Sequence, residues 1–373
     1  MKKTQLIEPY FPLSLSLSLL LLLTLSLFLV TACRMEVSKE DTYLFTDSLG
    51  REIELPKTIQ KVAPSGMVAT MILYAIAPDS LASVDRMPAE IYEKFFSKEY
   101  LALPITGQIY GITDLNPETL IELNPDVIID LGDQKTNMKE DLDALQEQLG
   151  IPVLFIQATM ETYPEAFRTL GKLLGEEAQG EALALYTEKT LTHAASQKEE
   201  ITKNHPYRVM FGTGESGLDC NAKGSVHSSV LELIGLENAI VVPEVNHKGG
   251  GNTITMEELM VADPEIILLD VGGPYASLGS DPYWSGLSAV QENQYYEIPC
   301  GPFFFLAGPP SINQIIGIDW LGNLLYPQLY SFDIRERIHE FYELFWHYSL
   351  SSEEIDDLLK NASAKELGDE NPH

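Results

Sequence analysis

The sequence has 373 residues, and 55 aspartates and glutamates against 24 lysines and arginines give it a formal net charge of −31 at pH 7. This excess of negative charge argues against nucleic acid and anionic membrane surfaces as partners, because their phosphate groups would be repelled. It is compatible with an exported protein that meets cationic ligands or partners.

The first 32 residues have the order of a secretory signal peptide. Lys2 and Lys3 precede an apolar stretch over residues 11–30, which ends at "VTAC". A charged start, an apolar centre and small residues before a cleavage point are typical of such signals. "VTAC" resembles a bacterial lipobox, so we expect cleavage before Cys33 and lipid on its thiol and new amino group. An uncleaved membrane anchor is the alternative, because the apolar stretch is long enough to span a bilayer.

The segments after Cys33 alternate between strand and helix patterns. Residues 33–41 are polar and predict a tether, and "YLFTDSLGREIEL" predicts a hairpin with "SLGR" as its turn. "KVAPSG" predicts a strand end that runs into a helix over "MVATMILYAIA", and "SLASVD" and "IPVLFIQ" predict further strands. We assign residues 42–160 to an N-terminal α/β lobe, within a mature chain of roughly two domains' length.

A long helical pattern separates this lobe from a second one. From Tyr163 to about Lys203, apolar residues recur at helical spacing, and Pro164 lies in the first turn. We assign 161–203 to a connecting helix, which is one long helix or two that abut. Strand patterns resume in "YRVMFGTG", "AIVVP", "EIILLDVG" and "YYEIP", which predict a C-terminal lobe over 204–330. Helices are expected over 331–361, including an amphipathic one in "IRERIHEFYELFWHY", before a polar tail over 362–373.

One segment occurs twice, once on each side of the connecting helix. "NPETLIELNPDVIIDLG" starts at residue 116 and "TMEELMVADPEIILLDVG" at residue 255, and each predicts a capped short helix, a proline turn and a strand. Strands that are apolar at every position suit a parallel sheet covered on both faces. Helix–proline–strand units are common in α/β proteins, so the identities alone prove little. Their placement predicts an α/β fold of two lobes with mostly parallel sheets, joined by a single long helix, with a ligand cleft between the lobes.

Ligands of open parallel sheets bind at the loops beyond the carboxyl ends of the strands. Two lobes that face each other place such loops on both walls of a cleft. Several of these loops are rich in glycine, which lets the backbone approach a ligand closely. The candidate ligand-binding residues in these loops are Ser65, Arg86, Met87, Gln108, Tyr110, His227, His247, Tyr275 and Phe304.

Several candidates have both a functional and a simpler explanation. Tyr110 and Phe304 offer aromatic walls for a large planar ligand or chelate, although core packing also explains phenylalanines. Arg86 suits an anionic ligand group, or is a solvated surface charge. His227 and Met87 suit ligation of a haem iron from opposite lobes, although His227 also fits the start of a helix.

Two cysteines remain after Cys33. Outside the cytoplasm, Cys220 and Cys300 can form one disulfide, or they are buried free thiols or soft metal ligands. We assign no metal site, because no cysteine or histidine has the spacing of a zinc site.

Enzymatic motifs do not fit the sequence. "GTGESG" is followed by Leu218, where a Gly-x-Ser-x-Gly nucleophile elbow needs glycine, and no Gly-Lys-Ser/Thr of a phosphate loop follows it. The pattern places no nucleophile beside a base. We therefore expect no catalysis, with an exported α/β hydrolase as the alternative from another class.

Five segments in order resemble the bacterial substrate-binding proteins of ABC importers for iron–siderophore complexes, haem and cobalamin. They are "LNPETLIELNPDVII", "GSVHSSVLELIGLENAI", "ITMEELMVADPEIILL", "DPYWSGLSAVQENQYYEIP" and "IGIDWLGNLLYP". The resemblance implies two α/β lobes joined by a rigid helix, a ligand in the cleft and limited closure.

The resemblance also implies partners. Members of the family dock on their permease through one glutamate per lobe, and the repeat places Glu118 and Glu257 at matching positions near the starts of their helices. We therefore expect a monomeric, lipid-anchored receptor on the bacterial membrane, facing the periplasm or cell exterior, without a cofactor of its own. It would bind a small-molecule metal chelate and deliver it to an ABC permease and its ATPase. A receptor for a simple metal ion or an oxyanion is the alternative.

Overall fold

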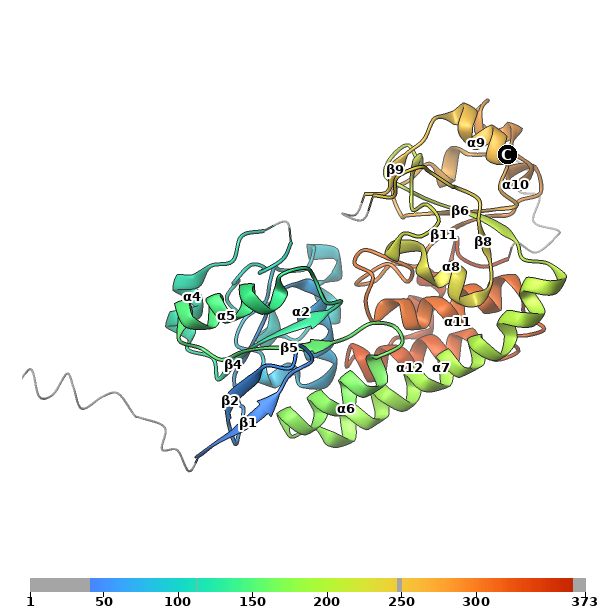
Figure 1. Ribbon diagram of the computed structural model, residues 1–373. Helices are drawn as coiled ribbons and strands as arrows, with labels where there is room; N and C mark the ends of the chain where they lie inside the picture. Colours follow the sequence, from blue (N-terminus) through green and yellow to red (C-terminus); the bar gives the residue numbers. More distant parts are fainter. Residues whose placement is uncertain (1–40, 112, 247–249, 365–373) are drawn as a thin grey trace, which may run out of the picture. The chain divides into compact units, whose positions relative to one another are not determined.

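The computed structural model in Figure 1 describes residues 41–111, 113–246 and 250–364. The predicted signal peptide, Cys33 and His247 lie outside these ranges. In the part of the chain that is described, no helix combines the length and the apolarity needed to cross a membrane.

The N-terminal half is built on a small parallel sheet. Its strands run in the order β3 (Val62–Pro64), β4 (Val127–Gly132) and β5 (Val153–Gln157). Ile129 of the central strand belongs to the same core cluster as α2, whereas its neighbour Ile128 packs with residues of α4 and α5. Both faces of β4 are therefore covered, as its unbroken apolar run predicts. The helices are α2 (Met67–Ile76), α3 (Lys98–Leu101), α4 (Pro117–Leu123) and α5 (Met138–Leu149).

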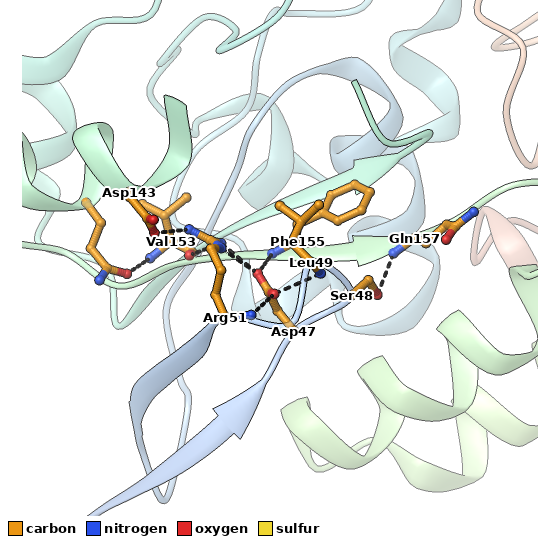
Figure 2. Close-up of polar contacts among 9 residues, drawn as sticks. Asp47, Ser48, Leu49, Arg51, Asp143, Val153, Phe155 and Gln157 are labelled. Carbon is orange, nitrogen blue, oxygen red and sulfur yellow. Dashed lines mark hydrogen bonds and ion pairs between the residues drawn. The ribbon is translucent and has the colours of Figure 1, made fainter. Parts of the chain in front are cut away.

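The predicted hairpin, β1 (Thr42–Thr46) and β2 (Glu52–Pro56), is joined to the free edge of β5 by its turn. Asp47 accepts from the Phe155 amide at 3.2 Å, and Ser48 Oγ accepts from the Gln157 amide at 3.0 Å (Figure 2). Arg51 pairs with Asp47 and donates to the Val153 carbonyl at 2.7 Å. The turn thereby satisfies backbone groups that an edge strand would otherwise expose.

"SLASVD" does not form a strand of this sheet, contrary to the sequence-based expectation. Its residues make only isolated bridges, Val62 to Leu81 and Val84 to Ile105. The chain turns there into the loop that carries Asp85 and Arg86.

The connecting segment is two helices rather than one, α6 (Tyr163–Leu174) and α7 (Glu177–Asn204). Gly175 ends α6 with a φ of 75°, a left-handed conformation that glycine adopts without a steric cost. The two helices then pack on each other (Figure 1), and Arg168 of α6 pairs with Glu181 and Glu188 of α7. Of the two alternatives expected for 161–203, the structure has the pair of helices, because a left-handed glycine reverses the chain.

The C-terminal half contains a second, separate sheet. Its strand order is β11-β10-β6-β7-β9, and β8 pairs with β6 beside it. Pairing is parallel except at β7, which is antiparallel to β6 and β9. The strand expected in "AIVVP", residues 239–243, does not form there; the short strand β8 (Glu237–Asn238) lies directly before it. The strands are β6 (Arg208–Thr213), β7 (Asp219–Cys220), β8 (Glu237–Asn238), β9 (Asn252–Thr253), β10 (Ile266–Leu269) and β11 (Tyr295–Glu297).

The repeated segments form equivalent helix–strand units. The second helix, α9 (Met256–Ala262), precedes β10 as α4 precedes β4. Asn116 and Thr255 cap the two helices with their side chains, and both helices end at a left-handed residue. Because β4 and β10 belong to different sheets, the prediction of two separate α/β units is confirmed.

Helices at the C-terminal end complete the core. Residues Ile338, Phe341, Tyr342 and Phe345 of α12 are buried, as the amphipathic pattern predicts. This helix packs on α7, α11 and α2, so it contacts both halves of the chain. The remaining helices are α8 (Ser229–Ile234), α10 (Ser288–Gln291), α11 (Asn313–Leu325), α12 (Ile334–Phe345) and α13 (Ser352–Leu359).

Candidate functional site

A cavity of about 270 Å³ is lined by residues from both halves of the chain. We call it the aromatic cavity, because rings dominate its wall. Helix α2, together with the loop and short helices that follow α2 in the chain, forms one wall of the cavity. Residues 300–308 and the end of α12 form the opposite wall. The lining residues are Met67, Thr70, Met71, Tyr74, Asp85, Arg86, Met87, Pro88, Ala89, Tyr92, Phe96, Tyr100, Cys300, Pro302, Phe303, Phe304, Gly308 and Trp346.

Helix α2 gives one continuous face to the aromatic cavity. Met67, Thr70, Met71 and Tyr74 line it, and their spacing of three and four residues places them on one side of the helix. Tyr74 packs edge-on against Tyr100, with ring centroids 5.0 Å apart. Ring contacts of this kind hold the aromatic wall in a defined arrangement.

A buried carboxylate organises the polar end of the aromatic cavity. Asp85 accepts hydrogen bonds from Thr70 Oγ1 at 2.8 Å, from Gln108 Nε2 at 2.9 Å and from Arg86 Nε at 3.0 Å. Its side chain is only 2% exposed, whereas that of Arg86 is 36% exposed. Three donors compensate the buried charge of Asp85, and one of them is the guanidinium that lines the cavity.

Glycines allow close packing within the loop that supplies Gln108. A Cβ on Gly111 would lie 1.5 Å from Gln108 Oε1, and one on Gly107, whose φ is +72°, would lie 2.0 Å from the Asp114 carbonyl oxygen. Gln108 is buried and does not line the aromatic cavity. The "GQIYG" loop therefore contacts Asp85 from outside the cavity, through the hydrogen bond that Gln108 donates to it.

Cys220 and Cys300 are both free thiols, so of the alternatives that the sequence left open for this pair the structure does not contain the disulfide. Cys220 is buried in the core of the C-terminal sheet, whereas Cys300 lines the aromatic cavity, where its Sγ lies 3.0 Å from the hydroxyl of Tyr92. The two thiols thus belong to different environments. Burial raises the pKa of each thiol to about 12, so both are protonated at neutral pH.

Of the predicted ligand residues, Arg86, Met87 and Phe304 are brought together in the aromatic cavity. Ser65 is buried directly after β3, where its hydroxyl donates to the buried carboxylate of Asp130. Among the described residues, the candidates Gln108, Tyr110, His227 and Tyr275 do not line this cavity either. Tyr110 donates to Asp141 at 3.2 Å, His227 lies in a short helix over Val226–Ser228, and Tyr275 packs on Tyr295.

Sequence reasoning missed most of the wall. Met67, Met71 and Tyr74 look like core residues of an apolar helix, and Trp346 looks like the end of a packed one. The available signal was the position of α2 directly after the "PSG" loop, because the first turn of such a helix faces the same edge of the sheet as the ligand loops.

Glu118 and Glu257 occupy the same position in the two repeated helices. Each follows the first helical residue, at the positively polarised end of its helix, and each is exposed. The fourth helical residue is a buried leucine in both, Leu120 and Leu259.

Among the described residues, no three His, Cys, Asp or Glu side chains converge to hold a metal ion. The aromatic cavity itself offers the Arg86 guanidinium with its paired Asp85 carboxylate, hydroxyl groups, sulfur atoms and rings. It is suited to bind a partly apolar small molecule.

Two α/β units with a ligand-sized cavity between their loops define the class of two-lobed binding proteins. Residues 70–300 match the periplasmic binding protein family, and the chain belongs to it. It is a solute-binding protein of an ABC importer and not an enzyme.

Individual relatives share this architecture at modest identity. The chain is 22% identical over 215 residues to a vitamin B12-binding protein of Pectobacterium atrosepticum, covering 56% of this chain and 74% of that one. It superposes on an ABC transporter solute-binding protein of Sulfurospirillum deleyianum with a TM-score of 0.78 at 28% identity, over 85% of this chain and 99% of that one. The molybdate periplasmic binding protein of Haemophilus influenzae has the same fold, with a TM-score of 0.65 at 17% identity over 83% and 99% of the chains.

Proposed function

We propose that this chain is a lipid-anchored, monomeric receptor that binds a metal chelate in the aromatic cavity and delivers it to an ABC permease and its ATPase. Iron–siderophore is the first choice of ligand, and haem or a corrinoid the second. The observation that carries the proposal is the cavity itself, because it joins loops of both halves and is walled by rings and thioethers.

The size of the aromatic cavity favours a compact chelate. Its volume of about 270 Å³ is slightly below the range of small-molecule sites, which run from about 300 to 1,000 Å³. A siderophore arm or a small chelate fits this space better than a whole corrinoid. A bare metal ion is disfavoured, since the described residues hold no cluster of metal-ligating side chains.

The two repeated helices support docking on a permease with two similar halves. Beside Glu118 and Glu257, one turn further along, are Ile121 and Met260, which are 53% and 43% exposed. Core packing accounts for the matching buried leucines, but it does not account for matching exposed apolar residues. A partner that meets a glutamate and an apolar side chain on each half accounts for both.

An absorption spectrum of the mature protein purified from its own host tests the ligand. A ligand-to-iron charge-transfer band supports an iron–siderophore, a Soret band supports haem, and corrin bands support a corrinoid. Protein that carries no chelate and binds none when offered iron(III) complexes, haem and cobalamin would contradict the proposal.

A Cys33→Ser variant tests the anchor. We expect the wild-type protein to fractionate with membranes and to shift in mass by its lipid, and the variant to lose the lipid. An unmodified wild-type Cys33 would overturn the lipid anchor while leaving the ligand proposal in place.

A further inference from the structure

We propose that the C-terminal half carries an apolar docking groove beside α9, which receives a basic and aliphatic segment of the permease. This inference rests on the proposed function and adds how the permease distinguishes the two halves of the receptor. We call this feature the α9 groove. It has a volume of about 450 Å³, and residues 239–243, Ile254 and four residues of α9 line it. All of these residues belong to the C-terminal half.

The α9 groove exposes aliphatic side chains from both of the main segments that form it. Val241 of the 239–243 segment is 73% exposed, and Val261 of α9 is 87% exposed. Ile240 and Ile254, which also line the groove, are buried. Single exposed apolar residues are common on protein surfaces, but a groove that gathers them beside buried ones marks an interaction site.

The segment 239–243 also leaves backbone groups unpaired. Its sequence "AIVVP" has the β-branched composition of a strand, yet it forms none. The amides of Ala239 and Ile240 are hydrogen-bonded within the protein, whereas those of Val241 and Val242 have no partner among the described residues. A partner segment can therefore meet both side chains and backbone donors along this part of the groove.

The repeated helix α4 differs from α9 at the position that lines the groove. The two helices have equal length, and the sixth residue is Val261 in α9 but the exposed Glu122 in α4. A permease segment that covers Val261 would bury an unpaired carboxylate if it covered Glu122 instead, which costs free energy. The shared glutamates fit either half of a permease, so the α9 groove is the feature that favours one orientation of the receptor.

The charges of the α9 groove indicate the chemistry of its occupant. Its described lining contains the carboxylates of Glu257 and Glu258 and neither lysine nor arginine. Glu258 accepts from the amide of Thr255 at 2.8 Å in the helix cap, whereas Glu257 has no partner among the described residues. A segment with lysine or arginine next to aliphatic side chains complements both the free carboxylate and the apolar lining.

Other occupants match these charges less well. Two copies of this chain, each with a formal net charge of −31, repel each other, and a second copy would bring further carboxylates to the groove. Anionic lipid headgroups are repelled in the same way. A permease is the natural partner of a solute-binding protein of an ABC importer, and we commit to it as the occupant.

Photo-crosslinking in the host identifies the occupant. A benzophenone amino acid is placed in the full-length chain at Val241, at Met260 of α9, or at Leu185 of α7. Met260 is exposed beside the groove without lining it, and Leu185, 55% exposed, is the control outside it. We expect Val241 and Met260 to crosslink to an extracytoplasmic loop of the permease, and Leu185 to give no such product. Mass spectrometry should place the Val241 crosslink in a peptide with lysine or arginine next to aliphatic residues.

A charge placed in the groove measures its contribution to docking. Val261→Glu gives α9 the residue that α4 has at this position, and its thermal melt should match that of the wild type because Val261 is exposed. Its affinity for the crosslinked permease with its ATPase, in nanodiscs, should fall about 10- to 100-fold, as expected when a buried valine contact is lost. Leu185→Glu makes the same charge change outside the groove and should alter docking by less than about 3-fold, because salt screens distant charges.

The outcomes separate the groove from the receptor function. A permease crosslink from Met260 but not from Val241 would overturn the groove and leave the receptor in place, as would a Val241 crosslink to lipid or to a second copy of the chain. Equal docking of Val261→Glu and Leu185→Glu would overturn it as well. Failure of both Val241 and Met260 to crosslink to a permease would overturn the inference together with the proposed docking.

Discussion

Replacing Arg337 by alanine should destabilise the protein strongly. The Arg337 guanidinium donates to Asp319 through Nε at 2.9 Å and through Nη2 at 2.6 Å, and to Thr190 at 2.9 Å. It also lies 3.9 Å above the ring of Tyr186. These contacts join α7, α11 and α12, which frame the C-terminal half.

The magnitude follows from burial. Asp319 is 1% exposed, so Arg337→Ala leaves a buried carboxylate without its cation. Removing one partner of such a pair costs about 3–5 kcal/mol of unfolding free energy. For a chain of this size, each kcal/mol lowers the melting temperature by about 2 °C, so we expect a loss of about 6–10 °C.

The same variant should depend on pH. Burial already raises the pKa of Asp319 although Arg337 is present, and without Arg337 that pKa rises further. A carboxyl whose pKa is raised by folding costs stability when ionised, and the cost disappears as pH falls through the folded-state pKa. The difference from wild type should therefore shrink between pH 8 and pH 5.

Thermal melts followed by circular dichroism at both pH values provide the assay. Arg335→Ala is the control on the same helix, because its pair with Asp356 is exposed and worth about 1 kcal/mol or less. Melting temperatures of the two variants that agree within about 2 °C would refute the reasoning, given the conversion used above.

Three further predictions concern Asp270 at the carboxyl end of β10, the hairpin formed by α6 and α7, and the two glutamates proposed to dock on the permease. Burial raises the pKa of Asp270 to about 7, about three units above its unfolded value, so Asp270→Asn should raise the unfolding free energy by up to about 4 kcal/mol at pH 8. At pH 4 the folded-state carboxyl is protonated and carries no buried charge, so the effect should nearly vanish. Equal effects in chemical denaturation at the two pH values would contradict this. A Cβ on Gly180 of α7 would lie 2.5 Å from the Phe167 carbonyl oxygen of α6, so Gly180→Ala should lower the unfolding free energy by about 1–3 kcal/mol. A helical glycine without such a neighbour would instead gain stability from the same change. A rise in melting temperature would exclude the close contact between the two helices. Glu118→Ala and Glu257→Ala should leave chelate affinity unchanged and reduce uptake by the host. Each should weaken docking on the permease by about 1 kcal/mol or less, and the double variant should weaken it more. Loss of chelate binding in the purified double variant would place the glutamates in the ligand site instead.

The sequence predicts the repeated units well because they are local. Capping residues, a buried leucine and a proline turn lie within a few residues of each other, and the structure reproduces them in α4–β4 and α9–β10. The exposure of Glu118 and Glu257 follows from the same helix geometry. The helix hairpin was less accessible, because a single left-handed glycine, Gly175, turns one helical pattern into two packed helices.

The aromatic cavity was predictable only in part, because it is assembled from distant segments. Arg86 and Phe304 lie in loops after strands, where position suggests a ligand contact. Tyr74 and Trp346 come from helices whose patterns indicate core packing, and they are far apart in the chain. The position of Gln108 in a loop after a strand predicts a ligand contact. Its hydrogen bond to Asp85 joins residues 23 positions apart, which the sequence alone does not reveal.

Anomalous diffraction from crystals of the protein purified with its natural ligand tests the central claim most directly. Data collected at the iron absorption edge, and at the cobalt edge if the spectrum shows a corrinoid, locate the bound metal. The account predicts one strong peak in or at the mouth of the aromatic cavity, within contact range of a chelate touching Arg86, Phe304 and Trp346. A metal peak elsewhere, beside Glu118 or Glu257 or on another surface, would contradict it.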